Sequence, residues 1–132
     1  MSRRVFNLLC AVISLCIGGI LYVLLRPNSH IAQIIDIDFF FSQETYFHLK
    51  PLSFFLPDFL WSFSLSGFLI SLYPQRKFNW FLCPAVAFML GIVWEVSQWL
   101  GVISGTGDFL DILMYFSAAT SVAVINLKGS FK

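Results

Sequence analysis

Hydrophobic residues along this chain are gathered into four long runs. The runs cover residues 5–25, 52–73, 80–100 and 109–127. The first run contains no charged residue, and the third and fourth contain one carboxylic acid each, Glu95 and Asp111. An α-helix rises 1.5 Å per residue, so about 20 residues cross the roughly 30 Å hydrocarbon core of a bilayer. The pattern therefore predicts four transmembrane helices.

The helix ends are predicted from the residues that interrupt the runs. Pro57 and Asp58 are typical of a helix start, because proline fits the first turn and a carboxylate favours the positive end of the helix dipole. We therefore expect helices at about 5–25, 55–73, 80–100 and 109–127.

Two of the connections between these helices have a distinct character. The glycine-rich segment 101–107 makes the last two helices an antiparallel hairpin. The outer loop 26–51 mixes isoleucine and phenylalanine with acidic residues. We expect it to lie in the membrane interface as a short helix or to fold over the outer end of the bundle.

Composition supports a membrane location. Hydrophobic residues make up 58% of the 132 residues and charged residues only 11%, against about 25% charged residues in soluble domains. Together with a net charge of +1, this excludes a soluble enzyme, a nucleic-acid binder and a disordered linker. The prediction is one all-α domain, 1–132: an integral membrane bundle of four transmembrane helices.

The basic residues predict how the chain is threaded, because lysine and arginine favour the cytoplasmic side. With the N-terminus inside, two basic residues lie outside, Arg26 and Lys50. Six lie inside: Arg3, Arg4, Arg76, Lys77, Lys128 and Lys132. The first run is too long for a typical cleaved signal peptide. We therefore expect a multi-pass protein of the cell inner membrane with both termini in the cytoplasm.

The few polar residues of the spans gather toward the outer side. Ionisable groups inside a membrane are costly and mark candidate sites. Glu95 and Gln98 share one face of the third predicted helix, and small residues beside these polar faces, Gly91 and Ala118, would let the helices approach closely. The predicted ligand-binding polar site consists of Asp58, Glu95, Gln98, Asp108, Asp111 and Tyr115.

Structural explanations remain open for several of these residues. Asp108 and Asp111 follow Thr106 and Gly107 in a pattern that resembles a capping box. Glu95 is harder to explain in this way, because it lies near the negative end of its helix dipole. We expect it to be protonated, paired with Arg26, or bound to an external group.

Two serines and two histidines are also interpreted structurally. Ser62 and Ser66 lie four residues apart, so they share a helix face and are expected to mediate helix contact. His30 and His48 fall in the outer loop without the spacing of a metal site. We expect no metal and no cofactor.

The strings Trp94-Glu95-Val96-Ser97-Gln98 and Gly105-Thr106-Gly107-Asp108-Phe109-Leu110-Asp111 resemble the VanZ-like family of small polytopic bacterial membrane proteins. The signature of this family is Glu-x-x-Gln late in one helix, a short loop, and Asp-x-x-Asp opening the next helix. The chain is a divergent case, since its loop lacks arginine, Tyr115 stands where asparagine is common, and Ala118 stands where glycine is common. The resemblance implies a protein of the cell envelope.

Three functions are consistent with this sequence. The first is a VanZ-like envelope protein whose outer acidic site engages a lipid-linked or amphiphilic ligand. The second is a small oligomeric transporter coupled to cations or protons. The third is a structural subunit of a larger membrane complex, held together by polar helix contacts. Enzymatic activity is not expected, because no Ser/His, Cys/His or metal-ligand arrangement is present.

Overall fold

The computed structural model describes residues 2–25, 43–73 and 79–127. Within these ranges the chain is helical except at the helix ends and in the loop that joins the last two helices. The helices are α1 (Arg3–Leu25), α3 (Gln43–Leu72), α4 (Asn79–Trp99) and α5 (Phe109–Leu127). Each contains a segment long and apolar enough to cross a membrane. The all-helical prediction and the four candidate spans are confirmed.

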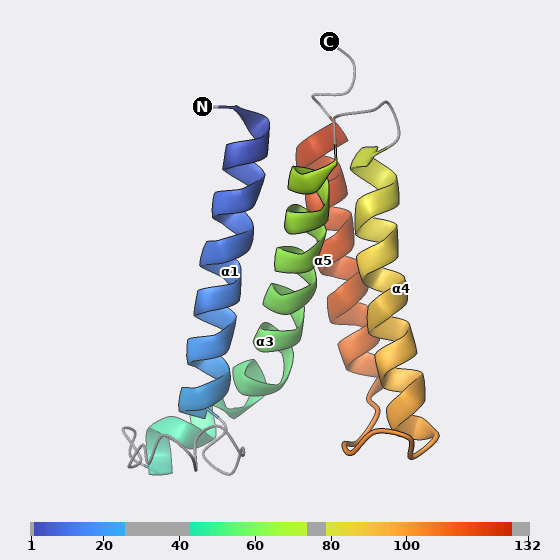
Figure 1. Cartoon of the computed structure of the whole chain (residues 1–132). Coiled ribbons are helices and arrows are strands. Elements are labelled where there is room, and N and C mark those ends of the chain that lie inside the picture. The colour runs from blue at the N-terminus through green and yellow to red at the C-terminus, as the bar shows by residue number, and fades with distance from the viewer. Residues whose placement is uncertain (1, 26–42, 74–78, 128–132) are drawn as a thin grey trace.

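The helices form a layered bundle in which α1 is peripheral. Helices α3, α4 and α5 pack against one another, whereas α1 packs mainly along α3 (Figure 1). The start of α1 and the end of α5 lie at the same end of the bundle (Figure 1). A hydrogen bond bridges the two helices there: Asn7 Nδ2 donates to Asn126 Oδ1 at 2.9 Å, and both side chains are buried.

Small residues allow α1 and α3 to approach closely. A Cβ atom at Gly67 would lie 3.3 Å from the Asn7 carbonyl oxygen, and one at Gly18 would lie 3.2 Å from Leu60 Cβ. Ser64 Oγ donates to the Ala11 carbonyl oxygen at 2.8 Å. This is the usual way in which membrane helices associate, since lipid provides no hydrophobic drive between them.

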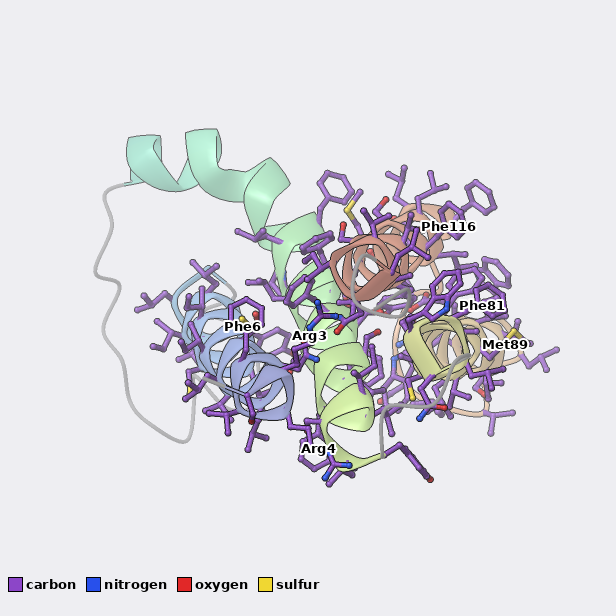
Figure 2. The ribbon with its side chains drawn as sticks, turned by 90° about the horizontal axis from the view of Figure 1, so that it is seen from above. Arg3, Arg4, Phe6, Phe81, Met89 and Phe116 are labelled. Atoms are coloured by element: carbon purple, nitrogen blue, oxygen red, sulfur yellow. The ribbon has the colours of Figure 1, made fainter. Side chains whose placement is uncertain are left out.

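The predicted start of the second helix is wrong, although the candidate membrane span within it, Phe55–Leu72, begins where the sequence predicts. Helix α3 begins at Gln43, so Pro57 and Asp58 lie inside it, and the last part of the predicted loop 26–51 is helical. The first part of α3 is turned away from the rest of the helix (Figure 2). A proline inside a helix removes one backbone hydrogen bond and bends the helix without having to end it. Residues 26–42 lie outside the described part of the chain.

The distribution of side chains is inverted relative to a soluble protein. Phe81, Met89 and Phe116 point outward (Figure 2) and are 54–56% exposed. The largest fully buried side chains are polar: Glu95, Ser62 and Ser66. Such an arrangement suits a hydrocarbon solvent, in which apolar side chains face lipid and polar ones face the bundle interior.

Candidate functional site

Glu95 lies at the centre of the polar residues and is 1% exposed. Its Oε1 accepts a hydrogen bond from the Tyr115 hydroxyl at 3.0 Å, and its Oε2 accepts one from the Asp108 backbone N–H at 2.9 Å. Both oxygens therefore have protein partners, as buried polar groups generally do. Glu95 thus has a structural role that its position near the negative end of α4 does not suggest. Arg26, one of the three partners or states considered for it, lies outside the described residues.

Asp108 caps α5, as the sequence pattern predicts. Its Oδ1 accepts a hydrogen bond from the Leu110 backbone N–H at 2.9 Å, which satisfies one of the free amides of a helix start. In a capping box, a side chain from the third helical residue returns to the backbone N–H of the cap. Here that N–H is bound by Glu95, from the preceding helix. The cap of α5 is thus completed from α4.

Helix α4 ends in a Schellman motif. The Gly101 N–H donates to the Gln98 carbonyl and the Val102 N–H to the Ser97 carbonyl, both at 2.9 Å. Gly101 has a φ of 68°, the left-handed conformation that this motif requires and that glycine adopts without steric cost. The motif turns the chain back toward the bundle.

The α4–α5 loop, residues 100–108, folds over the last turn of α4. A Cβ atom at Gly105 would lie 2.7 Å from Gln98 Nε2, and one at Gly107 would overlap the indole ring of Trp99. Gln98 therefore packs beneath the loop. Gln98 shares the predicted site with Glu95, but no hydrogen bond joins its amide to Glu95 among the described residues.

Tyr115 joins the three packed helices. Its hydroxyl lies 3.0 Å from Glu95 Oε1 on α4 and 3.3 Å from Asp58 Oδ1 on α3. Its ring sits directly on Gly91, where a methyl group would overlap it, and meets the Trp61 indole edge-on at a centroid distance of 6.0 Å. The predicted close approach of α4 and α5 at Gly91 is confirmed. The Tyr115 ring occupies the space that a side chain at position 91 would fill.

The predicted site residues thus fall into two sets. Asp58, Tyr115, Glu95 and Asp108 form one hydrogen-bonded series across α3, α5 and α4. Gln98 lies under the loop, and Asp111 is half-buried in the first turn of α5, four residues before Tyr115. Asp108 is exposed and Asp58 is half-buried. The site therefore has a buried centre, Glu95 and Tyr115, surrounded by acidic side chains that reach the surface.

The two serines of α3 differ from each other. Ser62 Oγ donates to the Tyr115 carbonyl oxygen at 3.3 Å, which confirms the expected helix contact. Ser66 Oγ is buried and has no hydrogen-bond partner among the described residues.

Sequence reasoning missed the buried pair Asn7–Asn126. Each asparagine stands in an otherwise apolar run, the first and the last of the chain. A side-chain amide in a membrane span needs a partner, so two isolated asparagines at the same predicted depth were a usable signal.

Among the described residues, no group of three His, Cys, Asp or Glu side chains could hold a metal ion. The side chains of His30 and His48 lie outside that set.

No family model, curated protein or solved structure matches this chain. The resemblance to the VanZ-like family therefore rests on short sequence motifs: Glu95, Gln98, Asp108 and Asp111, together with the segment Pro57-Asp58-Phe59-Leu60-Trp61.

Proposed function

We propose that this chain is a VanZ-like multi-pass membrane protein whose polar site binds an amphiphilic ligand with a cationic head group. The observation that carries the proposal is the hydrogen-bonded series Asp58–Tyr115–Glu95–Asp108 at one end of the three packed helices. Two of its members, Asp58 and Asp108, carry carboxyl groups that reach the surface of the bundle. Asp111 adds a third half-buried acid.

The chemistry of the surroundings favours a cation. The sequence has no lysine or arginine from 51 to 73 or from 79 to 127, so the segments that build the site supply acidic and neutral side chains only. Trp61 follows Asp58 by one helical turn and is 42% exposed. An exposed indole beside a carboxylate can hold an ammonium group by cation–π attraction, while its apolar surface contacts a hydrocarbon tail.

The proposed location rests on the basic residues of the chain, which favour the cytoplasmic side. We place the site at the outer face of the cell inner membrane, with both chain termini in the cytoplasm. Arg3 and Arg4 begin α1 at the opposite end of the bundle from the α4–α5 loop (Figures 1 and 2). Cysteine labelling tests this orientation in a variant without Cys10, Cys16 and Cys83. A membrane-impermeant maleimide added to intact cells should label Ser104→Cys and spare Ser2→Cys, and the reverse pattern would refute the orientation.

A binding measurement tests the function. The protein in zwitterionic lipid nanodiscs should bind dodecyltrimethylammonium, and dodecyl sulfate should bind more weakly. Asp58→Asn and Asp111→Asn should each weaken binding of the cationic probe, whereas Ser121→Ala, which alters an exposed hydroxyl on α5, should leave it unchanged. Equal binding of the two probes, or full binding by both acid variants, would contradict the proposal.

A structural subunit is the second candidate. This function is favoured because the buried polar groups bind one another: Glu95 and the Asn7–Asn126 pair form their hydrogen bonds with neighbouring helices of the same chain. This function predicts a stable partner protein that co-purifies in mild detergent. It also predicts that Asp58→Asn leaves that complex intact, because Asp58 is a surface-reaching group.

A further inference from the structure

The Tyr115 hydroxyl is placed between two carboxyl groups. Glu95 Oε1 lies 3.0 Å away and Asp58 Oδ1 lies 3.3 Å away, each on a different helix. A phenol has one proton to donate. That proton can bond strongly to one of the two carboxylates at a time, so Glu95 and Asp58 compete for it.

Glu95 in turn holds the beginning of α5. Its second oxygen accepts the Asp108 N–H at 2.9 Å, and Asp108 caps the helix through Leu110. Because a carboxyl group is planar, the hydrogen bond at Oε1 also orients Oε2. A firm bond from Tyr115 therefore keeps Glu95 aimed at the Asp108 amide.

We propose that Tyr115 is a positioning residue that couples occupancy of Asp58 to the α4–α5 loop. The inference rests on the proposed function, in which the cationic head group engages Asp58. A cation beside Asp58 makes its carboxylate a weaker acceptor, so the Tyr115 proton goes to Glu95. Glu95 then holds Asp108 more firmly, and the loop and first turn of α5 are more tightly closed.

The packing around Tyr115 fixes its ring and backbone, so the hydroxyl proton is the part that can change position. The ring rests on Gly91 on one side and meets Trp61 at its edge. Ser62 Oγ binds the Tyr115 carbonyl oxygen. The ring is thus held by two neighbours and the backbone by a third, and the choice between two acceptors is made by rotation of the hydroxyl.

Hydrogen exchange at the Asp108 amide tests the coupling without any ligand. The chain has five aspartates, so ¹⁵N-aspartate labelling yields five amide signals by NMR in nanodiscs. Tyr115→Phe, which retains the ring, should speed exchange at Asp108 by roughly two- to tenfold, the range set by one hydrogen bond. Asp58→Asn and Asp58→Ala should slow it, because they remove the competing carboxylate.

A merely structural role predicts a different result. If Asp58 only stabilised the bundle, its variants would speed exchange at Asp108. In the Tyr115→Phe background, Asp58→Asn should have no further effect, since the coupling passes through the hydroxyl. Faster exchange in both Asp58 variants, or an equal effect of Asp58→Asn with and without the hydroxyl, would overturn the proposal.

Addition of dodecyltrimethylammonium separates this inference from the proposed function. The probe should slow exchange at Asp108 in the wild type and leave it unchanged in Tyr115→Phe. Binding without any change in exchange would refute the coupling and leave the proposed function standing. Absence of binding, with the exchange pattern of the variants as expected, would refute the cationic ligand and leave the coupling standing.

Discussion

Glu95 on α4 completes the cap of α5 by accepting the Asp108 backbone N–H at 2.9 Å. The two residues are joined across a loop in which Gly105 lies against Gln98 and Gly107 against Trp99. A buried acid near the negative end of its own helix is thus placed at the positive end of the next one, where a carboxylate is favoured. The dipole of α4 disfavours a carboxylate at position 95, and the dipole of α5 favours it there.

Replacement of Glu95 should loosen the hairpin. Glu95→Ala leaves the Asp108 amide without its acceptor and the Tyr115 hydroxyl with only the longer bond to Asp58, and we expect a loss of about 1–3 kcal/mol in unfolding free energy. Glu95→Gln keeps one acceptor oxygen and should lose less. Unfolding by dodecyl sulfate, titrated into mixed micelles that contain the protein, measures the unfolding free energy of both variants. A stability equal to wild type in Glu95→Ala would show that these hydrogen bonds contribute nothing.

Gly91 and Gly19 form a matched pair of glycine substitutions within helices. A methyl group at Gly91 overlaps the Tyr115 ring, whereas nothing lies within 4 Å of one at Gly19. Gly91→Ala should cost about 1–3 kcal/mol through overpacking, and Gly19→Ala should be neutral or stabilising. The same micelle titration compares them, and an equal effect of the two substitutions would contradict the close contact.

Ser64 and Ser66 test the value of a buried hydroxyl. Ser64 Oγ binds the Ala11 carbonyl oxygen at 2.8 Å, whereas Ser66 Oγ is buried with no partner in the described part of the chain. Ser64→Ala should lower the unfolding free energy by about 0.5–1.5 kcal/mol. Ser66→Ala should be neutral or stabilising, because a desolvated hydroxyl is removed. Destabilisation by Ser66→Ala would reveal a partner outside the described residues.

The Asn7–Asn126 pair should be energetically coupled. The two amides share a buried hydrogen bond of 2.9 Å that ties α1 to α5. A double-mutant cycle with Asn7→Ala and Asn126→Ala should yield a coupling energy of about 0.5–2 kcal/mol. The control cycle pairs Asn7→Ala with Ser121→Ala, whose hydroxyl bonds within its own helix. Zero coupling between the asparagines, as in the control, would contradict the bridge.

Much of the architecture is encoded locally and was predictable from the sequence alone. Four apolar runs of membrane-spanning length determine four helices, because unpaired backbone groups are too costly in lipid for any other conformation. The predicted range 109–127 matches α5 completely, and Asp108 caps it as its position suggests. Local rules suffice here because caps and helix lengths depend on residues a few positions apart.

Contacts between helices were decided only by the tertiary structure. The break at Pro57 and Asp58 suggested a helix start, yet α3 continues through it from Gln43. For Glu95 the sequence left protonation, pairing with Arg26 and an external group open, and it did not indicate the donors that the structure places there: a tyrosine 20 residues later and an amide 13 residues later. Composition and periodicity specify which face of a helix is polar. They do not specify which donor meets which acceptor, because that depends on how three helices are packed and rotated against one another.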